Sequence, residues 1–246
     1  MVLYPIERDG PTAGMMPAWE AIELKQRAPA EDWWLVAQPD HAALSGELAR
    51  LIDSPFFPLL DEAAVQAIAL HDEGWIEFDA SIPRNRNRPI SFLEAPAPDF
   101  LAAWRGSIAV AERNSAIGGM MVSGHFCRIA RTGPGSADQS LIDDFLGEEK
   151  ARQERLLREH PRGSEVLNLL VDVLQFCDLL SLYLCCGSQR DIAFPQRFRG
   201  QSVRLRWEAE LCRLEPAILG KGASLAVPAR KFSDSRRSQS IPILVG

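Results

Sequence analysis

The feature that most constrains this chain is an acidic residue inside its longest apolar stretch. Residues 166–186 are almost uniformly apolar, yet Asp178 lies among them, on the same helical face as aliphatic side chains. Each aspartate at the centre of a membrane-spanning helix costs about 2.5–3.5 kcal/mol, and Asp172 adds a second one. We therefore expect a helix over about 164–186 in the core of a soluble protein, with no membrane partner.

The position of Asp178 also demands a partner for its charge. An isolated carboxylate among apolar side chains is very costly to ionise, so it needs a proton or a cation beside it. The sequence therefore predicts a cation opposite Asp178. The alternative is a degenerate site in which an arginine or a hydrogen-bond network holds the carboxylate.

The placement of the four histidines favours the cation. His41, His71 and His125 each lie three or four residues from apolar neighbours, which is the spacing of one helical face. These three side chains are expected to face the core. His160 lies at a charged helix end and is expected to be solvated.

A second carboxylate accompanies these histidines. Asp72 follows His71 at the end of a helix that we expect to begin at Asp61 and to stop at Gly74. Imidazole and carboxylate groups together bind borderline and hard divalent metals such as Mn, Fe, Co, Ni, Zn or Mg. The sequence predicts one or two such ions, held by His41, His71, Asp72 and Asp178.

The order of these residues resembles the HD superfamily of metal-dependent phosphohydrolases. The segment AIALHDEGW at 67–75 is similar to its signature turn, and QFCDLLSLYLC at 175–185 is similar to its final aspartate helix. The motifs QPDHAALSGELA, HDEGW, SFLE and CDLLSLYLC together resemble a bacterial HD-like family of unknown function. The resemblance covers about residues 35–190.

The resemblance implies that His41, His71, Asp72 and Asp178 are the metal ligands. His125 matches the position of an extra ligand in two-metal members, or of a substrate contact in others. Trp75 departs from the pattern, because a histidine commonly follows the signature glycine. With His125 as the one spare inward histidine, the sequence argues against a complete second metal site.

Other residues near the expected site are candidates for catalysis and substrate binding. Asp72 and His125 are the expected catalytic groups, and Glu73 could relay protons, although a surface charge at a helix end is the alternative. Arginine side chains bind phosphate in a bidentate manner, so the three arginines between residues 84 and 88 are expected to bind an anionic substrate. The alternative is that this segment is a solvated loop. Trp75 shapes the pocket mouth or simply packs in the core. The arginines are Arg84, Arg86 and Arg88.

The expected fold is mostly α: an HD-domain-like helical bundle with a small antiparallel β appendage. Residues 1–34, broken by prolines and glycines, are expected to be an irregular segment. Residues 35–190 form the helical metal-binding domain, and residues 191–246 a small β subdomain that packs on it.

The composition limits location and partners. A net charge of -6 and a pI near 5.3 argue against a general nucleic-acid grip. The five cysteines are odd in number and form no C-x-x-C pair, which indicates reduced thiols in a cytoplasmic protein. A homodimer is compatible with the sequence.

The function expected from these observations is metal-dependent hydrolysis of a phosphoester in a small phosphorylated or nucleotide-like substrate. A di-iron oxygenase of the HD type is a second interpretation, and it requires two metal ions. A third is a non-catalytic module that binds a metal or ligand for regulation.

Overall fold

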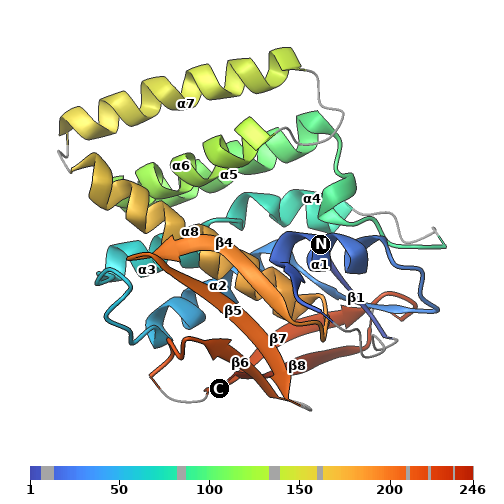
Figure 1. Cartoon of the computed structure of the whole chain (residues 1–246). Helices are drawn as coiled ribbons and strands as arrows, with labels where there is room; N and C mark the ends of the chain where they lie inside the picture. The colour runs from blue at the N-terminus through green and yellow to red at the C-terminus, as the bar shows by residue number, and fades with distance from the viewer. Residues whose placement is uncertain are drawn as a thin grey trace.

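The computed structural model describes residues 1–6, 14–81, 87–132, 139–159, 163–208, 211–220, 223–234 and 236–245. Helices form one side of the molecule, and a curled sheet lies beneath them (Figure 1). The helices are α1 (Ala18–Arg27), α2 (Gln38–Leu51), α3 (Glu62–Leu70), α4 (Ile76–Ser81), α5 (Ala97–Asn114), α6 (Ala116–Thr132), α7 (Gln139–Glu159) and α8 (Ser164–Cys185), with short 3-10 turns η1 (Glu73–Trp75) and η2 (Phe92–Glu94).

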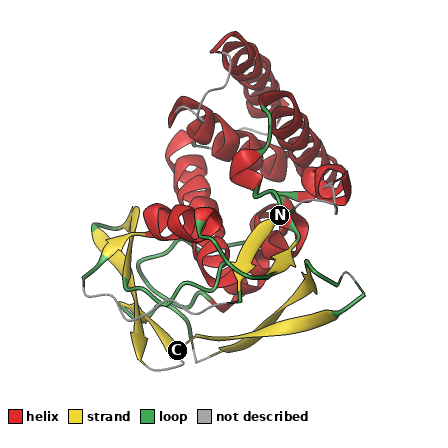
Figure 2. Ribbon diagram, turned by 90° about the vertical axis from the view of Figure 1, so that its right-hand side faces the viewer, coloured by secondary structure: helices red, strands yellow, loops and turns green. Residues whose placement is uncertain are grey.

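The strands join in a single mixed sheet in the order β1-β3-β7-β8-β6-β5-β4-β2. Most neighbours are antiparallel, whereas β2 pairs with β4 and β6 with β8 in parallel. The sheet curls around the lower ends of the helices (Figure 2). The strands are β1 (Val2–Pro5), β2 (Met16–Pro17), β3 (Trp33–Val36), β4 (Ile192–Phe198), β5 (Gln201–Glu208), β6 (Leu211–Glu215), β7 (Ala223–Lys231) and β8 (Ser238–Val245).

This sheet shows that the expected fold class was wrong. The protein is 56% helical and 22% strand, and its eight-stranded sheet is a half-barrel rather than a small appendage on a mostly α bundle. The pairing that makes it large is between distant segments, because Trp34 in β3 pairs with Lys231 in β7. A local hydrophobic pattern carries no signal for partners so far apart in the chain.

Of the first 34 residues, those that the structure describes (1–6 and 14–34) contain β1, β2, α1 and the start of β3, so the expectation of an irregular segment is also corrected. The buried side chain of Gln26, from α1, accepts a hydrogen bond from the Leu3 amide at 2.9 Å and donates one to the Leu3 carbonyl at 2.8 Å. This side chain satisfies backbone groups of an edge strand that would otherwise be buried without partners. Because β1 pairs with β3 and β3 pairs with β7, the N-terminal segment and the C-terminal strands belong to one sheet.

Helix α8 lies at the centre of the helical layer and contacts α1, α2, α3 and α6, as well as β1 and β4. Among the described residues it is the one helix long and apolar enough to cross a membrane, and 61% of its apolar window is buried inside the fold. The fold is therefore soluble-like, with α8 as its core helix. None of the five cysteines forms a disulfide bond, and all five are buried; the cytoplasmic location stays a prediction.

Candidate metal centre

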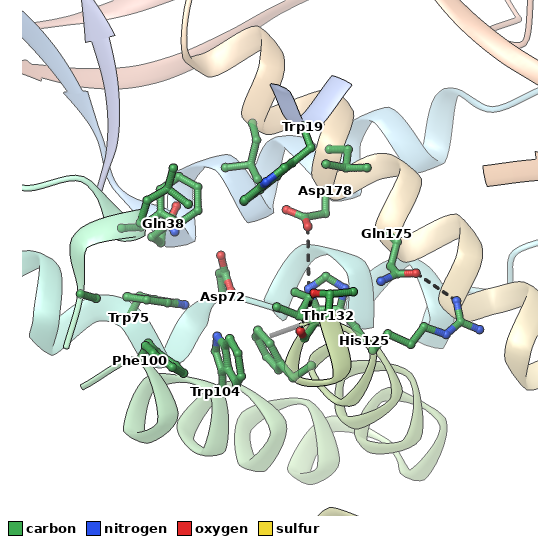
Figure 3. Close-up of a pocket in the computed structure, with 18 of the residues that line it drawn as sticks. Trp19, Gln38, Asp72, Trp75, Phe100, Trp104, His125, Thr132, Gln175 and Asp178 are labelled. Carbon is green, nitrogen blue, oxygen red and sulfur yellow. Dashed lines mark hydrogen bonds and ion pairs between the residues drawn. The ribbon is translucent and has the colours of Figure 1, made fainter. Parts of the chain in front are cut away.

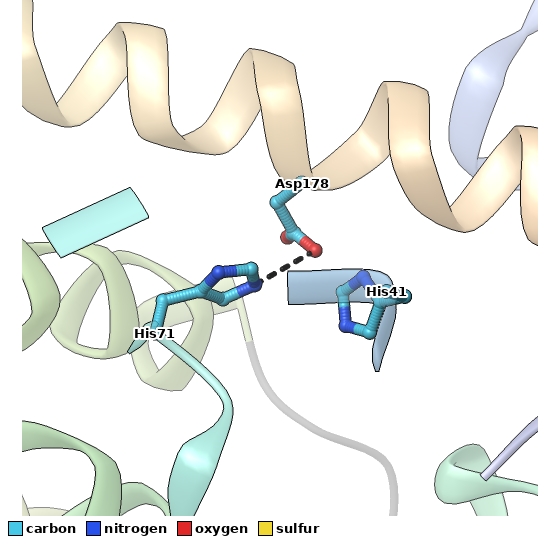
Figure 4. Close-up of side chains that lie close together, drawn as sticks. All are labelled: His41, His71 and Asp178. Carbon is cyan, nitrogen blue, oxygen red and sulfur yellow. Dashed lines mark hydrogen bonds and ion pairs between the residues drawn. The ribbon is translucent and has the colours of Figure 1, made fainter. Parts of the chain in front are cut away.

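Three segments of the chain bring the predicted ligands together. His41 comes from α2, His71 and Asp72 from the turn between α3 and η1, and Asp178 from α8 (Figure 4). Each of three buried residues offers one ligand atom, and these three atoms lie within 4.8 Å of one another. The residues are His41, His71 and Asp178. Asp72 lies at the edge of this cluster, with its Oδ2 atom 2.8 Å from His41 Nε2 and 3.9 Å from His71 Nε2.

Local structure fixes the turn that carries two of these ligands. Asp61 caps α3, because its Oδ1 atom accepts a hydrogen bond from the Ala64 amide at 2.8 Å, as the sequence predicts. At the other end of the helix, Gly74 packs directly on α5. A Cβ atom at this position would lie 2.1 Å from the Ala103 carbonyl oxygen. The close approach that only glycine allows therefore positions His71 and Asp72.

The outer ring nitrogens of both histidines are hydrogen-bonded, which leaves the inner nitrogens for the centre. His71 Nδ1 donates to the Ile68 carbonyl at 2.7 Å. His41 Nδ1 lies 2.9 Å from Ser181 Oγ, whose own proton goes to the Asp178 carbonyl at 2.9 Å. This arrangement orients the two Nε2 atoms toward the carboxylates, as in histidines that bind metal ions.

The electrostatics of the cluster are those of tightly coupled opposite charges. Burial opposes the protonation of His71, but Asp72 and Asp178 outweigh it and raise the His71 pKa to about 9. Burial likewise opposes ionisation of Asp178, but the His71 hydrogen bond at 3.3 Å and the nearby imidazoles lower its pKa to about 2. The proton on His71 therefore supplies the positive charge beside Asp178 that a bound cation could supply instead.

His125, on α6, completes the ring of groups around Asp178. Its Nε2 atom lies 3.8 Å from Asp178 Oδ2, while its Nδ1 atom is buried without a hydrogen-bond partner. Burial lowers the pKa of His125 to about 4, so its imidazole is neutral at pH 7. Asp178 thus presents one oxygen to His71 and the other to His125.

The residues present fit a divalent ion. Ligand bonds of about 2.0–2.2 Å place the atoms around one ion roughly 3 Å apart, close to the 2.8–3.9 Å spacings of this cluster. The ion pairs of Asp178 among the described residues are with His71 and His125, and none is with an arginine. The arginine form of the degenerate alternative therefore has no support in this part of the chain, whereas the hydrogen bond between His71 and Asp178 is compatible with its other form, a hydrogen-bond network.

A large cavity of about 1360 Å³ opens beside the cluster. Asp72, His125 and Asp178 line it at the metal end, and the indole rings of Trp75 and Trp104 face it further along (Figure 3). Arg128, paired with Asp172 at 2.6 Å, lies at another part of its wall. The predicted ligands therefore adjoin a space that could hold a substrate.

The remaining predicted residues have different positions. Trp75 lines the cavity, whereas Glu73 is half-buried and is not among the lining residues. The guanidinium of Arg88 donates to Glu94 at 2.9 Å and to the Gln26 carbonyl at 2.8 Å; Glu94 lines the cavity, whereas Arg88 itself is not among the lining residues. Arg84, Arg86 and His160 lie outside the described residues.

Sequence reasoning missed the groups that support the ligands and line the cavity. Ser181 was read only as part of an apolar helix, although its position three residues after Asp178 places it on the same face. Gln38 enters the sequence analysis only as the first residue of the motif QPDHAALSGELA, yet it is buried in the cavity wall. Phe100 and Trp104 carried only the signal of a helical apolar stripe, which core packing explains equally well.

Comparison with known families places the chain. A model described as "Protein of unknown function (DUF3891)" matches residues 26–234, which is more than half of the sequence. The chain belongs to the DUF3891 family. No curated protein and no solved structure matches it. The DUF3891 match contains every residue of the candidate metal cluster, and membership of the HD superfamily stays a prediction.

Proposed function

We propose that this protein is a divalent-metal-dependent hydrolase that cleaves a phosphoester. The observation that carries the proposal is the convergence of His41, His71 and Asp178, buried and mutually within 4.8 Å, at the end of a large cavity. Asp72 is the fourth group that would hold the ion. A bound divalent ion supplies Lewis acidity and acidifies a coordinated water molecule toward neutral pH.

The chain's own groups have distinct tasks in this proposal. Ser181 and the Ile68 carbonyl hold the two histidine rings in one orientation. Asp72 Oδ2 lies 2.8 Å from His41 Nε2, and Asp72 also lines the cavity, so it lies at the boundary between the cluster and the cavity. His125 is neutral and has a free Nδ1 atom, so it can exchange a proton with a substrate oxygen.

A two-metal oxidative chemistry is a second candidate, and one observation favours it. Asp178 divides its two oxygens between His71 and His125, which is an arrangement that a bridging carboxylate could adopt. Two irons per chain in aerobically purified protein, with a charge-transfer absorption band, would place this candidate first. One metal ion per chain would favour the hydrolase.

The test measures bound metal and turnover together. Elemental analysis gives the metal content, and phosphate or nitrophenol release from 4-nitrophenyl phosphate and its bis-ester gives the activity after loading with Mn, Fe, Co, Ni, Zn or Mg. We expect Asp178→Asn to lower both by about 100-fold or more. Asp144→Asn, on the exposed face of α7, is the matched control and should change neither.

Two results would contradict the proposal. Unchanged metal content and activity in Asp178→Asn would show that the cluster does not bind the ion that matters. Metal binding without turnover of either ester, with a chelator only lowering the melting temperature, would instead indicate the regulatory module.

A further inference from the structure

We infer that the cavity beside the metal cluster binds a hydrophobic molecule. The body of this molecule contains a ring, is uncharged and carries a hydroxyl-like polar group. This inference deepens the proposed function. It rests on that function only for the position of the ligand's reacting group, which would lie at the metal ion. Recognition of the ring itself depends on residues outside the metal cluster.

The size of the cavity is the first argument. Its volume of about 1360 Å³ exceeds the roughly 300–1,000 Å³ of pockets that enclose drug-sized ligands. A small sugar phosphate would fill a minor part of this space and leave most of the wall without contacts. The volume therefore indicates a substrate with a substantial organic body.

The second argument is the chemistry of the wall. Aromatic side chains from η1, α5 and α6 form the part beyond the metal cluster, and two further aromatic rings, in edge-to-face contact with centroids 6.4 Å apart, lie on α1 and η2. Flat aromatic surfaces bind rings through area burial and stacking. The wall residues are Trp75, Phe100, Trp104 and Phe126, and the further pair is Trp19 and Phe92.

The third argument is charge. Arg27 and Arg128 line the cavity, but each is already paired, with Glu23 at 2.7 Å and with Asp172 at 2.6 Å respectively. Arg197 is the third arginine of the lining, and it is exposed to solvent on β4. Within the described residues the deep wall thus lacks an uncommitted cation, so it offers little to a polyanion such as a nucleoside triphosphate.

The fourth argument comes from polar atoms that are buried in this wall without partners. Trp75 is 3% exposed and Gln38 is 1% exposed, and neither the Trp75 Nε1 donor nor the Gln38 Oε1 acceptor has a hydrogen bond. Figure 3 shows the Trp75 indole nitrogen at the end of its ring that faces the cavity. Because buried polar groups are normally paired, and because a hydroxyl can both accept and donate, a ligand hydroxyl could pair with either atom.

The test uses 2-naphthol as the neutral ring probe and ribose 5-phosphate and ATP as polar probes. Binding to chelator-treated protein is measured by calorimetry. We expect the Kd of 2-naphthol to be at least about tenfold lower than that of either polar probe. Equal or tighter binding of ATP, or no binding of 2-naphthol, would overturn the inference.

Variants identify the site. Trp75→Phe keeps an aromatic ring at this position but removes the indole N–H donor, and it should weaken 2-naphthol binding by about fivefold. Trp33→Phe is the matched control, because its indole nitrogen is also buried without a partner but lies outside the cavity. Equal effects of the two substitutions would contradict the assigned site.

The two proposals fail in different ways. If 2-naphthol binds but no phosphoester is hydrolysed by the metal-loaded protein, the ring site stands and the hydrolase does not. If ribose 5-phosphate is hydrolysed as fast as 2-naphthyl phosphate, the hydrolase stands and the inference about the substrate fails.

Discussion

The two ends of the central cavity differ in how completely their polar atoms are bonded. At the metal end, His41 and His71 are each held from behind by a hydrogen bond, and their inner nitrogens face carboxylates. At the aromatic end, Trp75 and Gln38 keep buried polar atoms without partners. Apart from His125 Nδ1, which is also buried without a partner, the protein itself therefore orders the metal end, whereas a bound molecule has to complete the aromatic end.

The largest effect should come from disturbing the turn that joins the two ends. In Gly74→Ala, the new Cβ would lie 2.1 Å from the Ala103 carbonyl and 2.5 Å from the Ser107 amide nitrogen, both of them backbone atoms. We expect a loss of about 3 kcal/mol in the free energy of unfolding, measured in urea, together with loss of bound metal.

Gly147→Ala is the control for this substitution. Nothing lies within 4 Å of its Cβ, and the residue is in the middle of α7. Alanine there should raise the free energy of unfolding by about 0.5–1 kcal/mol. Equal stability changes in both variants would show that the turn is not fixed by close packing.

The next effect is on the pH dependence of the metal end. The His71 pKa is raised from 6.5 to about 9, so the proton on His71 stabilises the metal-free fold fully below pH 6.5, and this contribution is lost as the pH rises through 9. An incoming ion must displace this proton. The Kd for the metal should therefore fall by about tenfold per pH unit between 6.5 and 9.

Calorimetry in two buffers of different ionisation enthalpy measures the proton directly, and release of about one proton per ion at pH 7.5 is expected. A Kd independent of pH would contradict the coupling. Asp178 acts in a different pH range, because its pKa is lowered from 3.8 to about 2. Its contribution to stability is present above pH 3.8 and is lost as the pH falls through 2.

A smaller effect separates the two ends. Ser181→Ala removes the hydroxyl that orients His41 but touches no atom of the aromatic wall. Metal affinity should fall by about 10–100-fold, while the Kd of 2-naphthol stays the same. Ser81→Ala, at an exposed helix end, is the control. A parallel loss of both affinities would mean that the ends are not independent.

The smallest effect is expected at Arg88, which the sequence assigns to substrate binding. Because its guanidinium joins a partly exposed Glu94 and the Gln26 carbonyl, Arg88→Ala should cost about 1 kcal/mol or less in stability and leave KM unchanged. A raised KM at unchanged stability would instead restore the substrate-binding role.

Much of the metal end could be predicted from the sequence, because its signal is local. Asp178 in an apolar helix, His41 on an apolar stripe and the His71-Asp72 pair at a helix end are each visible within one or two helical turns. These residues lie together in the structure. The ion itself stays a prediction.

The sheet and the aromatic end could not be predicted in the same way. The four residues of β1 acquire their structure from β3, about thirty positions later, and β3 in turn pairs with β7 near the other end of the chain. Such ladders depend on contacts that no local pattern encodes. Trp75, Phe100 and Trp104 look like ordinary core residues in sequence, and only their shared wall distinguishes them.

One consequence follows from the length of cavity wall that α8 provides. Asp172, Gln175, Asp178 and Leu182 all line the cavity and repeat at intervals of three and four along this single rod. Insertion or deletion of one residue between them would rotate everything beyond it by about 100°. We therefore expect the lengths of the connecting loops to vary among related sequences. Insertions and deletions within this segment of α8 should be absent from them.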